Sequence, residues 1–152
     1  QGGCISLDGV DDAEQFRGVN KAFGTIGIEP NKQMQVWHIA ASVLHLSNLR
    51  FDTIDHEQGE VASVADRAAL ATLAELLGVE EVVMEAMLTQ RVVTTRGEIF
   101  TKQLSVQDAS FTRDAIVKSL YEAMFLWIVK VINTSLGKGE DSLPFIGVLD
   151  IF

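Results

Sequence analysis

Cysteine is almost absent from this sequence, whose 152 residues include one, Cys4. A single thiol cannot form a disulfide within the chain, which fits a reducing compartment. No histidine lies near Cys4 in the sequence, so a catalytic thiol is not expected. Long apolar runs are missing too. The most apolar stretch, 123–129, ends at Lys130 and is far shorter than the roughly 20 residues that a membrane-spanning helix needs.

Basic residues are also scarce, with 12 Lys and Arg against 21 Asp and Glu, a net charge of −9. Nucleic acids and anionic membranes bind clustered Lys and Arg, so neither is an expected partner. The first twelve residues do not combine a basic segment with an apolar one, as a secretory signal does. We therefore expect a cytoplasmic protein without a membrane span.

The residues that are present are typical of a globular domain, because 47% are hydrophobic and 22% are charged. Apolar residues at helical spacing predict helices with capping residues at their ends. Residues 124–132 are apolar nearly all round, so we expect this part of the last helix to be covered on every side. The predicted helices span about 12–23, 30–48, 67–77 (between Asp66 and Gly78), 80–88 and 106–136 (capped by Ser105).

Extended segments are fewer. Residues 50–54 alternate as a short strand would, a turn is expected at 58–59, and residues 60–64 could be extended. From Arg91 to Lys102 the pattern changes to alternation around Arg96-Gly97, which predicts a β-hairpin or curled loop. Residues 145–152 read as a buried terminal strand. The expected fold class is mainly α, with one hairpin and one terminal strand. A start at Gln1 and a stop inside that strand also suggest a piece of a longer chain.

Metal chemistry is not predicted. His38 and His45 lie seven residues apart on one predicted helix, about 10 Å along its axis. Two ligands of one metal ion lie closer together than this. A metal-dependent hydrolase is therefore disfavoured for want of a ligand cluster. A free-standing α-helical interaction domain without nucleotide chemistry is the remaining alternative, although the terminal strand has no obvious partner in this sequence.

Four segments carry a further pattern: residues 3–12 with Phe16, 37–51, 114–133 and 146–152. In this order and at this spacing they resemble the myosin motor domain. The third matches the family's long helix (Asp-Ala-Leu-Ala-Lys, then Tyr, Phe-x-Trp and Ile-Asn), and the fourth matches the strand that runs into switch II. The resemblance covers essentially all 152 residues. It implies part of an α/β P-loop NTPase motor fold: 1–144 as the helical upper actin-binding subdomain and 145–152 as a strand of the central sheet.

This resemblance implies an ATP-driven motor on the actin cytoskeleton. Its partners would be filamentous actin, the rest of the heavy chain, and light chains or calmodulin bound through other regions. The longer protein would bind Mg-ATP, and there Asp150 would hold the Mg²⁺ water shell and couple phosphate release to movement, without acting as a nucleophile. The P-loop pattern Gly-x4-Gly-Lys-Ser/Thr is absent. Switch I and the Gly and Glu of switch II are absent as well, so this chain alone is not expected to bind or hydrolyse Mg-ATP.

The segment 91–102 is the candidate contact with actin. Three cations and one acid give it a charge of +2, against −9 for the whole chain. Actin is acidic, so such a patch would steer the encounter, and Ile99 and Phe100 would supply apolar contacts. By resemblance, Glu98, sixteen residues before Asp114, occupies the regulatory position that carries an acid or a phosphorylatable Ser or Thr. A fixed acid implies actin activation without phosphorylation. The simpler interpretation is a solvated hairpin. The charged residues are Arg91, Arg96, Glu98 and Lys102.

Overall fold

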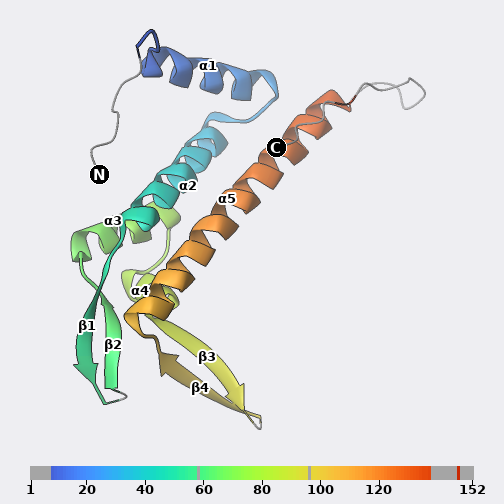
Figure 1. Ribbon diagram of the computed structural model, residues 1–152. Coiled ribbons are helices and arrows are strands. Elements are labelled where there is room, and N and C mark those ends of the chain that lie inside the picture. Colours follow the sequence, from blue (N-terminus) through green and yellow to red (C-terminus); the bar gives the residue numbers. More distant parts are fainter. Residues whose placement is uncertain (1–7, 58, 96, 138–146, 148–152) are drawn as a thin grey trace.

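The computed structural model describes residues 8–57, 59–95, 97–137 and 147. A long helix, α5, lies beside α2, and two hairpins project from the same end of the molecule (Figure 1). The prediction of a mainly α fold is confirmed. The elements are α1 (Asp12–Thr25), α2 (Pro30–Asn48), β1 (Phe51–His56), β2 (Gly59–Val64), α3 (Arg67–Leu77), α4 (Glu81–Thr89), β3 (Gln90–Thr95), β4 (Glu98–Gln103) and α5 (Val106–Leu136).

The number of hairpins differs from the prediction. The sequence predicts one hairpin, whereas the described residues form two, because β1 and β2 also pair antiparallel from Phe51↔Val64 to His56↔Gly59. Gly59 makes the tight turn possible, since its φ of 98° is one that residues with a side chain rarely adopt. The predicted terminal strand, 145–152, lies outside the described residues apart from Gly147, and so does Asp150.

Helix ends follow local side-chain chemistry, as the sequence predicts. Asp66 accepts a hydrogen bond from the Ala69 amide at 3.0 Å, and Ser105 accepts one from the Asp108 amide at 3.1 Å. Each cap satisfies an amide that the first turn of a helix leaves without a partner. Gly78 ends α3 in the left-handed conformation, with φ 66°.

The main core lies at the end of the molecule from which the hairpins emerge. It gathers one apolar face from each of α2, α3 and α4 and covers it with β1, β2 and the start of α5. The fully buried large apolar side chains all belong to this end of the molecule and to helices, so the helices form the core and the hairpins extend outward from it. They are Leu46, Leu70, Leu73, Met84 and Leu88.

A second cluster holds the other end of the molecule together. Phe23, Ile28 and Val36 are buried there, and the half-buried rings of Trp37 and Trp127 pack against them. The Trp37 indole donates a hydrogen bond to Asn20 Oδ1 at 2.8 Å, and its ring lies 4.8 Å from that of Phe16. These contacts seat α1 on α2. Both tryptophans are half-buried and lie at the edge of this cluster.

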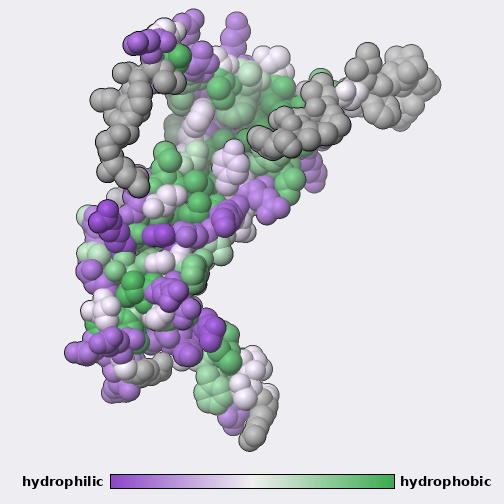
Figure 2. All heavy atoms as spheres, viewed as in Figure 1, coloured by the Kyte–Doolittle hydropathy of each residue, from purple (hydrophilic) through white to green (hydrophobic). Residues whose placement is uncertain are grey.

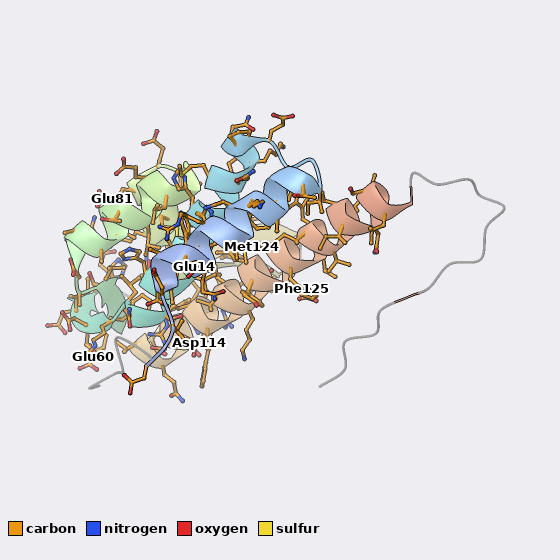
Figure 3. The ribbon with its side chains drawn as sticks, turned by 90° about the horizontal axis from the view of Figure 1, so that it is seen from above. Glu14, Glu60, Glu81, Asp114, Met124 and Phe125 are labelled. Carbon is orange, nitrogen blue, oxygen red and sulfur yellow. The ribbon has the colours of Figure 1, made fainter. Side chains whose placement is uncertain are left out.

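Within this chain, α5 is covered on one side and open on the other. Met124 packs against the second cluster, whereas its neighbour Phe125 points away and is 51% exposed (Figure 3). Tyr121 and Leu126 are exposed to a similar extent, at 56% and 57%. The prediction that this stretch is covered on every side is wrong for the chain by itself, because its other described elements reach only one face. No helix among the described residues is long and apolar enough to cross a membrane.

The same substitution should have opposite effects at two glycines. Gly18 lies within α1 with open space around it, so Gly18→Ala should stabilise the fold by about 0.5–1 kcal/mol through helix propensity. Gly78 has a positive φ, so Gly78→Ala should destabilise it by about 1–2 kcal/mol despite equally open space. Urea unfolding followed by circular dichroism measures both. Equal effects of one sign would show that backbone conformation does not govern these positions.

Candidate functional site

The candidate site is the hairpin formed by β3 and β4. Its register pairs Arg91 with Lys102, Val93 with Phe100, and Thr95 with Glu98. Gly97, with φ 85°, lies in the turn between the strands. The prediction of a hairpin at 91–102 is therefore confirmed. Five of the six predicted contact residues lie on its strands, and the sixth, Arg96, falls outside the described residues.

Strand alternation divides these residues between two faces. Directly opposed residues share a face and successive pairs alternate, so Arg91, Glu98, Phe100 and Lys102 lie on one face. Ile99 lies on the other face. The sequence predicts that Ile99 and Phe100 both supply apolar contacts, and in the structure they point in opposite directions.

Val92 is an exposed residue that the sequence analysis missed. Its side chain is 69% exposed and shares the face of Ile99, which is 73% exposed. Strict alternation from Arg91 would have found it, because a β-branched residue one position further along must point the opposite way. The hairpin thus carries a cationic face with one aromatic ring and an apolar face with Val92 and Ile99.

The cationic face contains an unfavourable pair. Arg91 and Lys102 are directly opposite, and among the described residues neither forms an ion pair. Like charges at directly opposed positions destabilise a hairpin. Glu98 is the one acid on the hairpin, and it lies opposite Thr95 next to the turn, two pairs along the same face. The two cations therefore face solvent together and do not help the hairpin to fold.

The base of the hairpin is anchored through Leu104, the buried residue that follows β4. Its amide donates to the Thr89 carbonyl and its carbonyl accepts from the Ala62 amide, each at 2.8 Å. Leu104 is 4% exposed and belongs to the main core. The hairpin therefore has a fixed base and a tip that projects from the body as a narrow protrusion (Figure 2).

An exposed ion-pair network lies between the two helices that precede the hairpin. Arg67 on α3 donates to Glu85 at 2.5 Å and to Glu81 at 2.8 Å, both on α4. The hydrogen bond to Glu85 raises the pKa of Arg67, whose guanidinium is charged at physiological pH in any case. Figure 3 shows Glu81 on the outer surface. The network links α3 to α4 and does not involve Arg91 or Lys102.

Neither a cluster of metal ligands nor a phosphate-binding loop marks the described part of the chain. No three His, Cys, Asp or Glu side chains gather there as metal ligands would. A groove of about 270 Å³ between α2 and α5 is lined mainly by apolar side chains such as Ile39 and Trp127, with Lys32 its one charged residue. It lacks the glycine-rich loop that cradles phosphates. Asp150, the predicted Mg²⁺-shell residue, lies outside the described residues.

Comparison with known proteins identifies the family. Residues 1–152 match the model described as "Myosin head (motor domain)". The chain belongs to the myosin motor-domain family. It is 38% identical over 155 residues to Myosin-14 of Arabidopsis thaliana and 39% over 153 residues to the Myosin-I heavy chain of Dictyostelium discoideum. It is 37% identical over 153 residues to Unconventional myosin-Vb of Homo sapiens. Each match covers 100% of this chain but only 6–10% of the myosin relative.

Charge exchange in this myosin hairpin should raise its stability. Lys102→Glu replaces a repulsive cross-strand pair with an attractive one, so the free energy of unfolding should rise by about 0.2–1 kcal/mol at low salt. The gain should shrink as salt screens the pair. The control Lys102→Gln removes the repulsion without adding an attraction. Its free energy of unfolding should lie between those of the wild type and Lys102→Glu. Urea unfolding at low and high salt measures all three. A loss of stability in Lys102→Glu would contradict the register described above.

Proposed function

We propose that this chain is the upper actin-binding subdomain of an ATP-driven motor, and that the β3–β4 hairpin is one of its contacts with filamentous actin. The observation that carries the proposal is the opposed pair Arg91 and Lys102, which are exposed together on a hairpin whose base is fixed. A like-charge pair of this kind weakens the hairpin locally, and such uncompensated local costs are expected at functional sites. Family membership favours this motor function over a free-standing interaction domain.

The contact forms in two stages. The cations first steer the hairpin toward the acidic filament, and this term weakens as salt rises. Phe100, on the same face and 51% exposed, then loses contact with water against the partner. Ile99 and Val92, on the opposite face, pack where the filament surface extends around the tip. The β3–β4 hairpin therefore contacts the filament through both of its faces.

The link between the hairpin and the nucleotide is α5 in this proposal. Two residues separate the end of β4 from the start of the helix, which continues for 31 residues, about 46 Å. Residues 145–152 follow it and lead into switch II, where Asp150 holds the water shell of Mg²⁺. ATP closes the loops around its γ-phosphate while the actin cleft opens, and phosphate release reverses both changes. A long, regular helix suits the transmission of such a movement.

The other partners follow from the same proposal. The rest of the heavy chain covers the open face of α5, where Tyr121, Phe125 and Leu126 are exposed. Mg-ATP binds the longer protein and not this chain alone, and light chains or calmodulin bind through other regions. The protein works in the cytoplasm, on the actin cytoskeleton. Glu98, next to the hairpin turn, supplies a permanent negative charge, so actin activation needs no phosphorylation there.

Co-sedimentation of the chain with filamentous actin tests the proposal. The wild-type chain should pellet weakly and less at raised salt, and a variant with Arg91, Arg96 and Lys102 changed to Glu should lose this binding. A matched control changes Arg17, Lys21 and Lys32 to Glu. These residues lie on α1 and at the start of α2, toward the end opposite the hairpins (Figure 1).

The control makes the same change in net charge and should keep most of the binding. Equal pelleting of the wild-type chain and the hairpin variant would contradict the assignment of the contact to β3–β4. Circular dichroism of each variant establishes that the helices are intact before the comparison is made.

A further inference from the structure

Arg113 joins two parts of the chain that are far apart in sequence. Its Nη1 donates a hydrogen bond of 2.7 Å to the carbonyl of Leu49, 64 residues earlier. Its Nε and Nη2 both contact Asp114 Oδ1, at 2.9 and 2.7 Å. The Arg113 side chain is 19% exposed, whereas that of Asp114 is 51% exposed. Arg113 is thus a largely buried cation whose orientation is set by its neighbour.

The partner of Arg113 explains why a cation is favourable there. Leu49 is the residue that ends α2, and it is 2% exposed. The carbonyl groups at the end of a helix carry a partial negative charge, which a nearby cation stabilises. The planar guanidinium of Arg113 donates to the Leu49 carbonyl and to Asp114 at once, which a lysine cannot reproduce with the same geometry.

The position of this contact relates it to both hairpins. Leu49 lies two residues before β1, and Arg113 lies in the second turn of α5, which follows β4. A separate link, from the Ala62 amide to the Leu104 carbonyl, joins β2 to the end of β4. The bases of the hairpins are therefore connected at two points. Two separated attachments restrict rotation about either one, so the angle between the hairpins depends on both.

We propose that Arg113, oriented by Asp114, is a positioning residue that fixes the angle between the β1–β2 and β3–β4 hairpins. The β3–β4 hairpin is then presented to its partner in one orientation. The geometric part of this inference stands on the contacts above, and its consequence for actin rests on the proposed function. Figure 3 shows Asp114 near the start of α5, outside the core that the helices form.

The distance between the two hairpins tests directly whether Arg113 fixes the angle between them. Spin labels are placed at Glu57→Cys and Glu98→Cys, both exposed and next to the turns, in a Cys4→Ser background, and pulsed electron paramagnetic resonance gives the distance distribution. In Arg113→Ala the distribution should broaden and shift. Arg113→Lys, which keeps the charge, should restore it in part. Asp114→Asn is a milder second variant, which serves if Arg113→Ala does not fold. It should also broaden the distance distribution.

A matched control separates positioning from a general loss of stability. Asn20→Ala removes one side-chain hydrogen bond of 2.8 Å, to Trp37, at the far end of the molecule. It should lower the unfolding temperature and leave the inter-hairpin distance unchanged. A distribution in folded Arg113→Ala or Asp114→Asn that matches the wild type would overturn the proposal, and so would equal broadening in the control.

Actin co-sedimentation of the unlabelled variants tests the consequence. The apparent affinity of Arg113→Ala should fall about fivefold, because only the fraction of molecules with the hairpin in the docking orientation can bind. Broadening without any loss of affinity would overturn the functional half of the proposal. A wild-type chain that does not bind actin would count against the proposed function instead, and the distance measurement would still decide the role of Arg113.

Discussion

The backbone of Leu104 is the constraint on which the candidate site depends. It is the first of the two residues that separate the projecting hairpin from α5, and its amide and carbonyl bond to Thr89 and Ala62 on two different elements. Its side chain is buried in the main core, so the two hydrogen bonds are shielded from competing water. Without this anchor the hairpin would be a two-stranded ribbon, a structure that is marginally stable in water by itself. The core thereby gives a short exposed element a defined direction.

Charge on this hairpin opposes the general trend of the molecule. A chain of net charge −9 exposes Arg91 and Lys102 side by side, with the nearest acid of the hairpin two pairs away. The arrangement lowers the stability of the hairpin slightly and strengthens the local positive potential. Such a local potential governs encounter rates with an acidic partner more than it governs folding. A fold that tolerates this repulsion on an anchored hairpin is consistent with selection for binding at that position.

The long helix α5 combines two different surroundings. One side packs against α2, α4 and the two hydrophobic clusters, while Tyr121, Phe125 and Leu126 on the other side stay exposed. An apolar face of this kind gains free energy when another surface covers it, at roughly 25 cal/mol for each Å² removed from water. The myosin motor-domain family provides a reason for such a face, since the relatives are more than nine times longer than the matched part. In the proposed motor, α5 connects the hairpin to the segment that leads toward the nucleotide.

The sequence by itself determined where the helices begin and end. Asp66 and Ser105 bond to amides three residues away, and Gly78 adopts its left-handed conformation for reasons internal to its own backbone. These interactions act within one turn, so local patterns predict them. Alternation likewise predicted the hairpin at 91–102, although its division into two faces became clear only from the register.

Only the tertiary structure decided which distant residues meet. The contact of Arg113 with Leu49 spans 64 residues, and no local pattern encodes it. The pairing of β1 with β2, the anchoring of Leu104 and the open face of α5 depend in the same way on how several elements share one core. Burial depends on the whole chain at once, whereas capping and alternation depend on a few neighbours. For this reason the sequence gives only candidate site residues, and the tertiary structure determines their orientation.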